Sequence, residues 1–188
     1  MPGPAFADGD AVSLHPIEDE DHEFIQYGRN QPDVRVPLTD TDIRTLDDVA
    51  ESVEDSDDRF LICVDDRDDS TDGPASSDAD NPTPVGEVAF AWVSQAGEHG
   101  SLMYWIAPDH QGNGYVTEAT TLFLDYVFGE RGFHRVDAHV LAPNEASQAA
   151  LEKLGFEREG QRRDDAIVDG EYVDTYTYGL LDHEWLDD

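Results

Sequence analysis

A glycine-containing segment that joins an expected strand to an expected helix constrains the fold of this chain more than any other feature. The segment covers residues 106–116 and carries Gly112 and Gly114. It follows an apolar run at residues 101–106 and precedes a helical pattern over residues 117–128. A helix that begins directly after glycines presents unpaired backbone N–H groups and the positive end of its dipole. The segment therefore suits an anion such as a pyrophosphate.

Two better-known glycine loops are excluded here. A Walker A loop would need the sequence Gly-Lys-Ser/Thr, and a dinucleotide-binding loop would need a third glycine where Thr117 stands. Taken by itself, the segment also fits a plain tight turn between a strand and a helix. The rest of the sequence has to decide between a ligand loop and a structural turn.

The remaining strand and helix patterns follow one another in an irregular order. Strands are expected at residues 12–14, 60–64, 85–93, 101–106, 136–141, 156–163 and 171–180, and helices at residues 18–29, 40–52, 117–128 and 144–154. In the second helix, Asp40 and Thr41 are the expected caps, and Ile43, Leu46 and Val49 are the expected buried residues. This order predicts a mixed α/β (α+β) fold in a single domain over residues 1–188.

Residues 65–84 form the most polar stretch of the chain. They include many Asp, Ser and Pro residues and no apolar side chain larger than alanine, so they cannot contribute to a core. We expect an acidic, solvated loop. The alternative is a metal site built from its carboxylates, which is weaker because the Asp spacing does not match a calcium loop. No metal is expected elsewhere either.

Acidic residues dominate the composition. The chain has 44 Asp and Glu against 11 Lys and Arg, and its formal net charge is -33. Nucleic acids and anionic membrane surfaces would be repelled, so neither is an expected partner. Acid spread along the whole chain resembles proteins of a salt-filled, halophilic cytoplasm, where a short screening length weakens the repulsion. The lack of about 18 consecutive apolar residues and of a signal-peptide pattern also predicts a cytoplasmic location.

The glycine segment becomes specific when its neighbours are compared with a known motif. The pattern Ile106-xxxx-Gln111-xx-Gly114-x-Val116 resembles the acetyl-CoA motif of GNAT acetyltransferases, although Val116 stands where a small residue is usual. The sequence NEASQAALEKLGFE at residues 144–157 resembles the ribosomal-protein N-acetyltransferase (RimJ/RimL-like) branch. The same holds for YWI at residues 104–106, GYVTEA at residues 114–119 and the closing YGLL at residues 178–181. The resemblance implies the GNAT fold, with a central, mostly antiparallel twisted sheet flanked by about four helices.

The resemblance also implies a site for acetyl-CoA, used as a cosubstrate without a metal. The strand end would pair its backbone with the pantetheine arm, and the glycine loop would hold the pyrophosphate. Asn144 would contact the pantetheine, cap its own helix, or do both. The implied cofactor-binding residues are Trp105, Ile106, Gln111, Gly112, Asn113, Gly114, Tyr115, Val116, Asn144 and Ser147.

The family mechanism, a direct attack of an amine on the thioester, needs an acid for the leaving sulfur and a base for the amine. The helix tyrosine that often serves as the acid is replaced by Leu151, so Ser147, one turn earlier, becomes the candidate. Glu87 and His139 are the candidate bases, because each is expected to project from the sheet toward an amine. A chain of water molecules is the alternative base.

Two functions remain open from sequence. One is an N-acetyltransferase that acts on a primary amine, whether a protein N-terminus or a small molecule. The other is a non-catalytic, acyl-CoA-binding regulatory module. The expected partners are acetyl-CoA and an amine acceptor, and a homodimer stays open as an alternative to a monomer.

Overall fold

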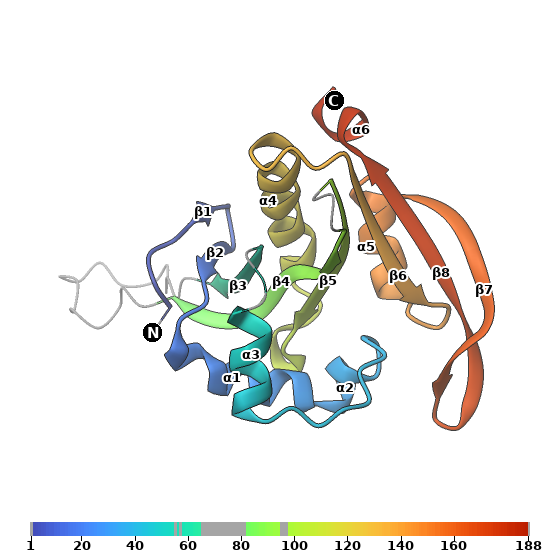
Figure 1. Ribbon diagram of the computed structural model, residues 1–188, viewed down its shortest axis with the longest axis horizontal. Coiled ribbons are helices and arrows are strands. Elements are labelled where there is room, and N and C mark those ends of the chain that lie inside the picture. Colours follow the sequence, from blue (N-terminus) through green and yellow to red (C-terminus); the bar gives the residue numbers. More distant parts are fainter. Residues whose placement is uncertain (1, 55, 57, 65–81, 95–97, 188) are drawn as a thin grey trace.

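The computed structural model describes residues 2–54, 56, 58–64, 82–94 and 98–187, which build one eight-stranded sheet with helices on both faces (Figure 1). The strand order is β1-β2-β3-β4-β5-β6-β8-β7, and every neighbouring pair is antiparallel except β5 and β6. The strands are β1 (Ala7–Asp8), β2 (Ser13–Pro16), β3 (Arg59–Val64), β4 (Thr83–Val93), β5 (His99–Ile106), β6 (Arg135–Leu141), β7 (Glu157–Val168) and β8 (Glu171–Leu181). The predicted mixed α+β class with a mostly antiparallel sheet is confirmed.

Six α-helices accompany the sheet in the described part of the chain. They are α1 (His22–Asn30), α2 (Pro32–Arg35), α3 (Leu46–Glu54), α4 (Tyr115–Gly129), α5 (Glu145–Lys153) and α6 (Asp182–Leu186). Single 3-10 turns lie at Asp19–Asp21 and Pro108–His110. The predicted helices correspond to α1, α3, α4 and α5. The short α2 and α6 and the two-residue β1 were not predicted, because they are too short to show a periodic pattern in the sequence.

The alternation of side chains along β3 divides the interior into two cores. Phe60 and Ile62 belong to the main core, which α4 and α5 cover, whereas Leu61 and Cys63 pack against α1 and α3 on the other face. Successive strand residues point to opposite faces, so a strand covered on both sides is apolar throughout. The continuous apolar run of β3 is therefore the sequence signature of a central, two-sided strand.

The helix α4 follows the pattern expected for residues 117–128 and extends it at both ends. Packing on the sheet removes its buried side chains from water, and burial of each large apolar one stabilises the fold by roughly 1.5–3 kcal/mol. They are Ala119, Thr120, Phe123, Leu124, Val127 and Phe128. Gly114, with φ of 81°, precedes the first turn, so the helix begins directly at the glycine loop.

The second helix begins later than its sequence suggests. Asp40 does not cap it, because its carboxylate is held by Arg29 at 2.7 Å and by Arg44 at 2.9 Å. Thr45 and Asp48 cap it instead: Thr45 Oγ1 accepts a hydrogen bond from the Asp48 N–H, and Asp48 Oδ2 accepts one from the Thr45 N–H. Thr41 lies outside the helix as well.

The expected inward face of this helix was also partly wrong. Val49 is buried, but Leu46 is 41% exposed and Ile43, which precedes α3, is 83% exposed. Ile43 lies before the helix, so helical spacing does not determine where it points, and Leu46 is the first residue of the helix, where the packing is less complete than at Val49.

The start of β4 corrects the predicted loop over residues 65–84. Thr83 and Pro84 are the first residues of β4 and pair with Val64 and Cys63, across a register shift that follows Ile62. A proline is tolerated at such a strand start, where its missing N–H breaks no regular ladder. Residues 65–81, the rest of the expected acidic loop, lie outside the described residues.

The sheet opens between β5 and β6, the one parallel pair. These strands pair only through His99–Ser101 on β5 and Arg135–Asp137 on β6. Beyond this point β5 continues to pair with β4, and β6 continues to pair with β8. The two halves of the sheet therefore diverge, and alternate backbone N–H and C=O groups of β5 face the gap without a strand partner.

Candidate active site

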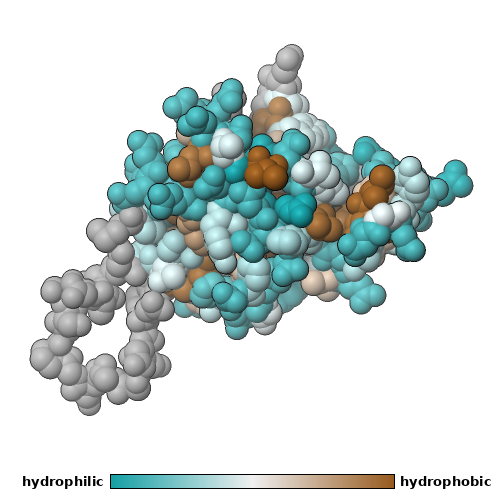
Figure 2. Space-filling model, turned by 90° about the horizontal axis from the view of Figure 1, so that it is seen from below, coloured by the Kyte–Doolittle hydropathy of each residue, from teal (hydrophilic) through white to brown (hydrophobic). Residues whose placement is uncertain are grey.

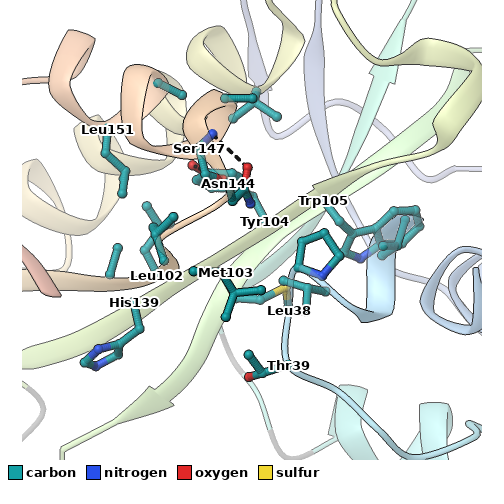
Figure 3. A pocket seen from close by; sticks show the side chains of 18 of the residues that line it. Leu38, Thr39, Leu102, Met103, Tyr104, Trp105, His139, Asn144, Ser147 and Leu151 are labelled. Atoms are coloured by element: carbon teal, nitrogen blue, oxygen red, sulfur yellow. Dashed lines mark hydrogen bonds between the residues drawn. The ribbon is translucent and has the colours of Figure 1, made fainter. Parts of the chain in front are cut away.

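A cavity of about 1090 Å³ occupies the gap between the diverging strands (Figure 3). Its walls come from β5, the loop that leads into α4, β6, the first turns of α5, the segment around α2 and the β7–β8 hairpin. Every cofactor-site residue implied by the resemblance lines this cavity. The tertiary structure thus brings together the two sequence segments that carry the resemblance, residues 105–116 and 144–147.

The strand β5 divides the cavity into two sides, which we name by their helices. Leu102, Tyr104 and Ile106 point to the α5 side, where they join the main core. Met103 and Trp105 point to the opposite side, the α1 side, where they pack with residues of α1 and α2. Figure 3 shows Tyr104 directed toward α5 and Met103 directed away from it.

The glycine loop is held in shape by its own side chains. Gln111 Nε2 donates to the carbonyl oxygen of Ile106 at 3.0 Å, and Asn113 Nδ2 donates to that of His110 at 3.0 Å. Gly112 and Gly114 adopt φ values of 80° and 81°, which side-chain-bearing residues seldom adopt. A Cβ at either glycine would meet no atom within 4 Å, so both glycines face open space in the cavity.

The backbone amides of this loop are available to a ligand. The first helical hydrogen bonds accepted by Gly114 come from Thr117 and Glu118. Among the described residues, none accepts a hydrogen bond from the N–H groups of residues 112–116. These unpaired donors, at the positive end of a 15-residue helix, could hold an anion without a cationic side chain.

The start of α5 places a hydroxyl in the cavity. Asn144 is the N-cap, and its side-chain oxygen accepts a hydrogen bond of 3.2 Å from the Ser147 N–H. The hydroxyl of Tyr104 donates to Ser147 Oγ at 3.2 Å, drawn as a dashed line in Figure 3. Leu151 is fully buried one turn further along and carries no polar group. Burial raises the pKa of Tyr104, although its bond with Ser147 acts in the opposite direction.

A histidine lies on the α1 side of the cavity. Ala138 and Val140 of β6 face the main core, so His139 between them faces the other way. His139 Nε2 lies 3.2 Å from one carboxylate oxygen of the buried Asp137, and His99 Nε2 bonds to the other oxygen. With its proton on Nε2, beside this carboxylate, a neutral imidazole would offer Nδ1 as an acceptor.

Glu87 does not lie where the sequence suggested. It is fully buried on β4 and is not among the residues that line the cavity. Arg59 Nε donates to one of its carboxylate oxygens, and Trp105 Nε1 donates to the other at 2.6 Å. The carboxylate therefore neutralises a buried guanidinium and holds an indole, rather than projecting toward an acceptor.

The sequence reasoning missed two residues of this site, Tyr104 and Asp137. Tyr104 belongs to the quoted YWI motif, and its two-residue spacing from Ile106 places both on one face of β5. Asp137 is two residues before His139, so the same rule places both on one face of β6. The missing signal was the spatial neighbour of each side chain: no local pattern reveals that Tyr104 meets Ser147 or that Asp137 lies beside His139.

The cavity is far less acidic than the chain as a whole. Asp33 and Asp165 are the only carboxylates among the described residues that line it, and Asp165 accepts a 2.6 Å hydrogen bond from Thr175. No group of three or more His, Cys, Asp or Glu side chains in the described part of the chain could hold a metal ion. Among the described helices, none combines the length and the apolar character that a membrane crossing requires.

Two curated proteins with related sequences are named N-acetyltransferases. YdaF of Bacillus subtilis (strain 168), provisionally named a ribosomal N-acetyltransferase, is 34% identical over 100 residues, which cover 53% of this chain and 55% of that relative. The [ribosomal protein uS5]-alanine N-acetyltransferase of Escherichia coli (strain K12) is 30% identical over 109 residues, 57% of this chain and 56% of that relative. The chain thus spans about half the length of these curated relatives.

A solved structure shares the fold over nearly the whole chain. The spermidine N-acetyltransferase of Vibrio cholerae, solved in complex with CoA and spermine, superposes with a TM-score of 0.78 at 20% identity, covering 95% of this chain and 99% of that one. Residues 12–157 match the family model described as "Acetyltransferase (GNAT) domain", which is well over half of the chain. The predicted GNAT fold is confirmed, and the chain belongs to the GNAT acetyltransferase domain family.

Proposed function

We propose that this protein is an acetyl-CoA-dependent N-acetyltransferase that acts on a primary amine. The observation that carries the proposal is the opening between β5 and β6, where free helix-terminal amides, a free strand edge and a hydroxyl meet in one cavity. No cysteine is among the described residues that line the cavity, and the amine would attack the thioester directly. The names of the relatives support the reaction class. The matches cover only about half of each relative, so they do not identify the substrate.

The residues present fit acetyl-CoA. The unpaired amides of residues 112–116 suit the pyrophosphate, and the open glycine positions let it approach the backbone. The unpaired edge of β5 beyond Ser101 offers N–H and C=O groups to the amides of the pantetheine arm. The side chains of Trp105 and Ile106 are buried, so their contribution would come from the backbone. Tyr115 and Val116 complete the helix start.

The catalytic groups that we propose lie on opposite sides of β5. On the α5 side, Ser147 would give a proton to the leaving sulfur. On the α1 side, His139, oriented by Asp137, would accept a proton from the amine through Nδ1. A backbone N–H of β5 would stabilise the oxyanion. Glu87 has no part in this proposal, because both of its oxygens are engaged outside the cavity.

The acceptor is proposed only as a class, a primary amine. The E. coli relative is named for a ribosomal protein and the V. cholerae structure for spermidine, so the relatives span a protein N-terminus and a small molecule. The charge of -33 is consistent with a salt-rich cytoplasm, which remains our proposal for its location. A second copy of the chain also remains a proposed partner.

Thiol release from acetyl-CoA, measured in molar KCl with a panel of amines, tests the proposal. We expect release that depends on the amine and that falls strongly in Ser147→Ala. Reactions without an amine are the control. If the protein binds CoA in calorimetry but releases no thiol with any amine, the non-catalytic acyl-CoA module is the better description.

A further inference from the structure

The hydroxyl groups of Tyr104 and Ser147 form a pair that joins two elements distant in sequence. Tyr104 comes from β5 and Ser147 is the third residue of α5, and the two oxygens are 3.2 Å apart. Both residues line the cavity, in the part where Figure 3 also places Asn144 and Leu151. Leu102, Ala138, Val140 and Leu151 also line this side, and they carry no side-chain donor.

Ser147 is held by two hydrogen bonds with different roles. Its N–H donates to Asn144 Oδ1, which fixes the helix start. Its Oγ accepts from Tyr104, and a hydroxyl that accepts such a bond keeps its own proton free for another acceptor. Burial raises the pKa of Tyr104 more than its bond with Ser147 lowers it. Tyr104 therefore keeps its proton at neutral pH and remains the donor of the pair.

We infer that Tyr104 is a positioning residue that acts through Ser147, turning the Ser147 proton toward the leaving sulfur. This inference rests on the proposed function. Leu151 leaves the usual helix position without a hydroxyl, and the geometry supplies a second hydroxyl from β5 instead. Tyr104 itself touches Ser147 rather than the reacting atoms.

The proton and electron balance of the step is simple. The acceptor nitrogen forms a bond to the carbonyl carbon, the C–S bond breaks, and its electron pair leaves on sulfur. Ser147 gives its proton to that sulfur, while the Tyr104 hydrogen bond stabilises the developing charge on Oγ. The proton lost by the acceptor nitrogen passes to His139 and returns to Ser147 through solvent. No oxidant, metal or further reactant is needed.

A double-mutant cycle with Tyr104→Phe and Ser147→Ala tests this coupling. We expect Tyr104→Phe to lower kcat about tenfold and to change the KM for acetyl-CoA by less than about twofold. In the Ser147→Ala background, the same change should have almost no effect, because the residue through which Tyr104 acts is gone. Tyr178→Phe is the matched control: its hydroxyl also donates over 3.2 Å, to Glu152, but it does not line the cavity.

A spectroscopic measurement tests the pair without turnover. The ultraviolet change on tyrosine ionisation, taken as the difference between a protein and its Tyr104→Phe variant, reports the Tyr104 pKa. Loss of the Ser147 hydroxyl should raise that pKa further, because Ser147 lowers it in the native protein. Calorimetry should give the same CoA affinity for Tyr104→Phe as for the native chain, within about twofold.

The outcomes separate the two proposals. If the native protein releases no thiol with any amine, the proposed function fails, whatever the ionisation of Tyr104 shows. If it turns over and Tyr104→Phe behaves like Tyr178→Phe, or if the losses of the two single variants multiply in the double variant, the inference is overturned. An unchanged Tyr104 pKa in Ser147→Ala would overturn it as well.

Discussion

The indole nitrogen of Trp105 donates a 2.6 Å hydrogen bond to Glu87, whose other carboxylate oxygen accepts from Arg59. Glu87 is fully buried and Arg59 nearly so, and Arg59 also donates to the backbone oxygen of Ser52 at 2.9 Å. The cavity strand β5 is thereby tied to β3, β4 and the end of α3. This relationship makes Glu87 part of the support of the site and determines what its removal should do.

Glu87→Gln should destabilise the protein by roughly 3 kcal/mol, because it leaves a buried guanidinium without a counter-charge. Urea unfolding measures this loss. Glu159→Gln is the control, since Glu159 pairs with Arg135 at the exposed edge of the sheet and should cost less than about 1 kcal/mol. A variant that keeps its stability and loses more than a hundredfold in kcat would instead identify Glu87 as a base.

Gly114→Asn should weaken CoA binding at least tenfold, about 1.4 kcal/mol, because a side chain would enter the space that the pyrophosphate needs. Asparagine tolerates positive φ, so the backbone cost stays small. Gly132→Asn is a matched control: Gly132 also has positive φ, at 69°, and open space around its Cβ, and it does not line the cavity. Equal CoA affinity of the two variants in calorimetry would show that the loop at Gly114 does not bind the pyrophosphate.

Asp137→Asn should lower kcat about tenfold or more without changing the KM for acetyl-CoA, because it removes the negative charge beside His139 Nε2 and replaces one carboxylate oxygen by an NH2 donor. His139→Ala should lose at least as much. His99→Gln is the control, since His99 binds the same carboxylate from β5 without lining the cavity. Normal turnover by His139→Ala would leave water as the base.

Asp40→Asn should destabilise the protein at neutral pH and lose this effect in acid. Burial raises the pKa of Asp40, but the hydrogen bonds and charges of Arg29 and Arg44 outweigh it and hold the pKa below the ordinary 3.8. A depressed pKa contributes stability above the unfolded pKa, and this stability is lost as pH falls through the folded value. Urea unfolding at pH 7 and at acid pH, below about 4, should show the difference between the native chain and variant shrinking. An equal difference at both pH values would show that charge is not the cause.

The thermal midpoint should rise steadily from dilute buffer to molar KCl. Figure 2 shows a face that is largely hydrophilic, and the chain carries a net charge of -33. The screening length is about 30 Å at 0.01 M salt, comparable to a small domain, and about 3 Å at 1 M. Mildly acidic pH should partly replace salt if repulsion is the cause. A midpoint that stays flat or falls with KCl would contradict the halophilic interpretation.

The sequence alone predicted the elements whose patterns are long and regular. Helices α4 and α5 and strands β3, β7 and β8 all follow from local periodicity. The candidate cofactor loop also came from sequence, because glycines between a strand and a helix need few distant partners to make their amides available. The start of α3 did not, since a salt bridge from α1 removed Asp40 as its cap.

The catalytic arrangement that we propose depends on the tertiary structure. In the sequence, Glu87 and His139 looked equivalent as strand residues. In the structure, Arg59 and Trp105 bind the Glu87 carboxylate, whereas His139 lines the cavity. The role that we infer for Tyr104 depends on the opened sheet, which places it beside Ser147. Local sequence determines backbone conformation and which face a side chain takes. Which side chains meet across 43 positions of the chain is determined by the packing of whole elements, and no local pattern encodes it.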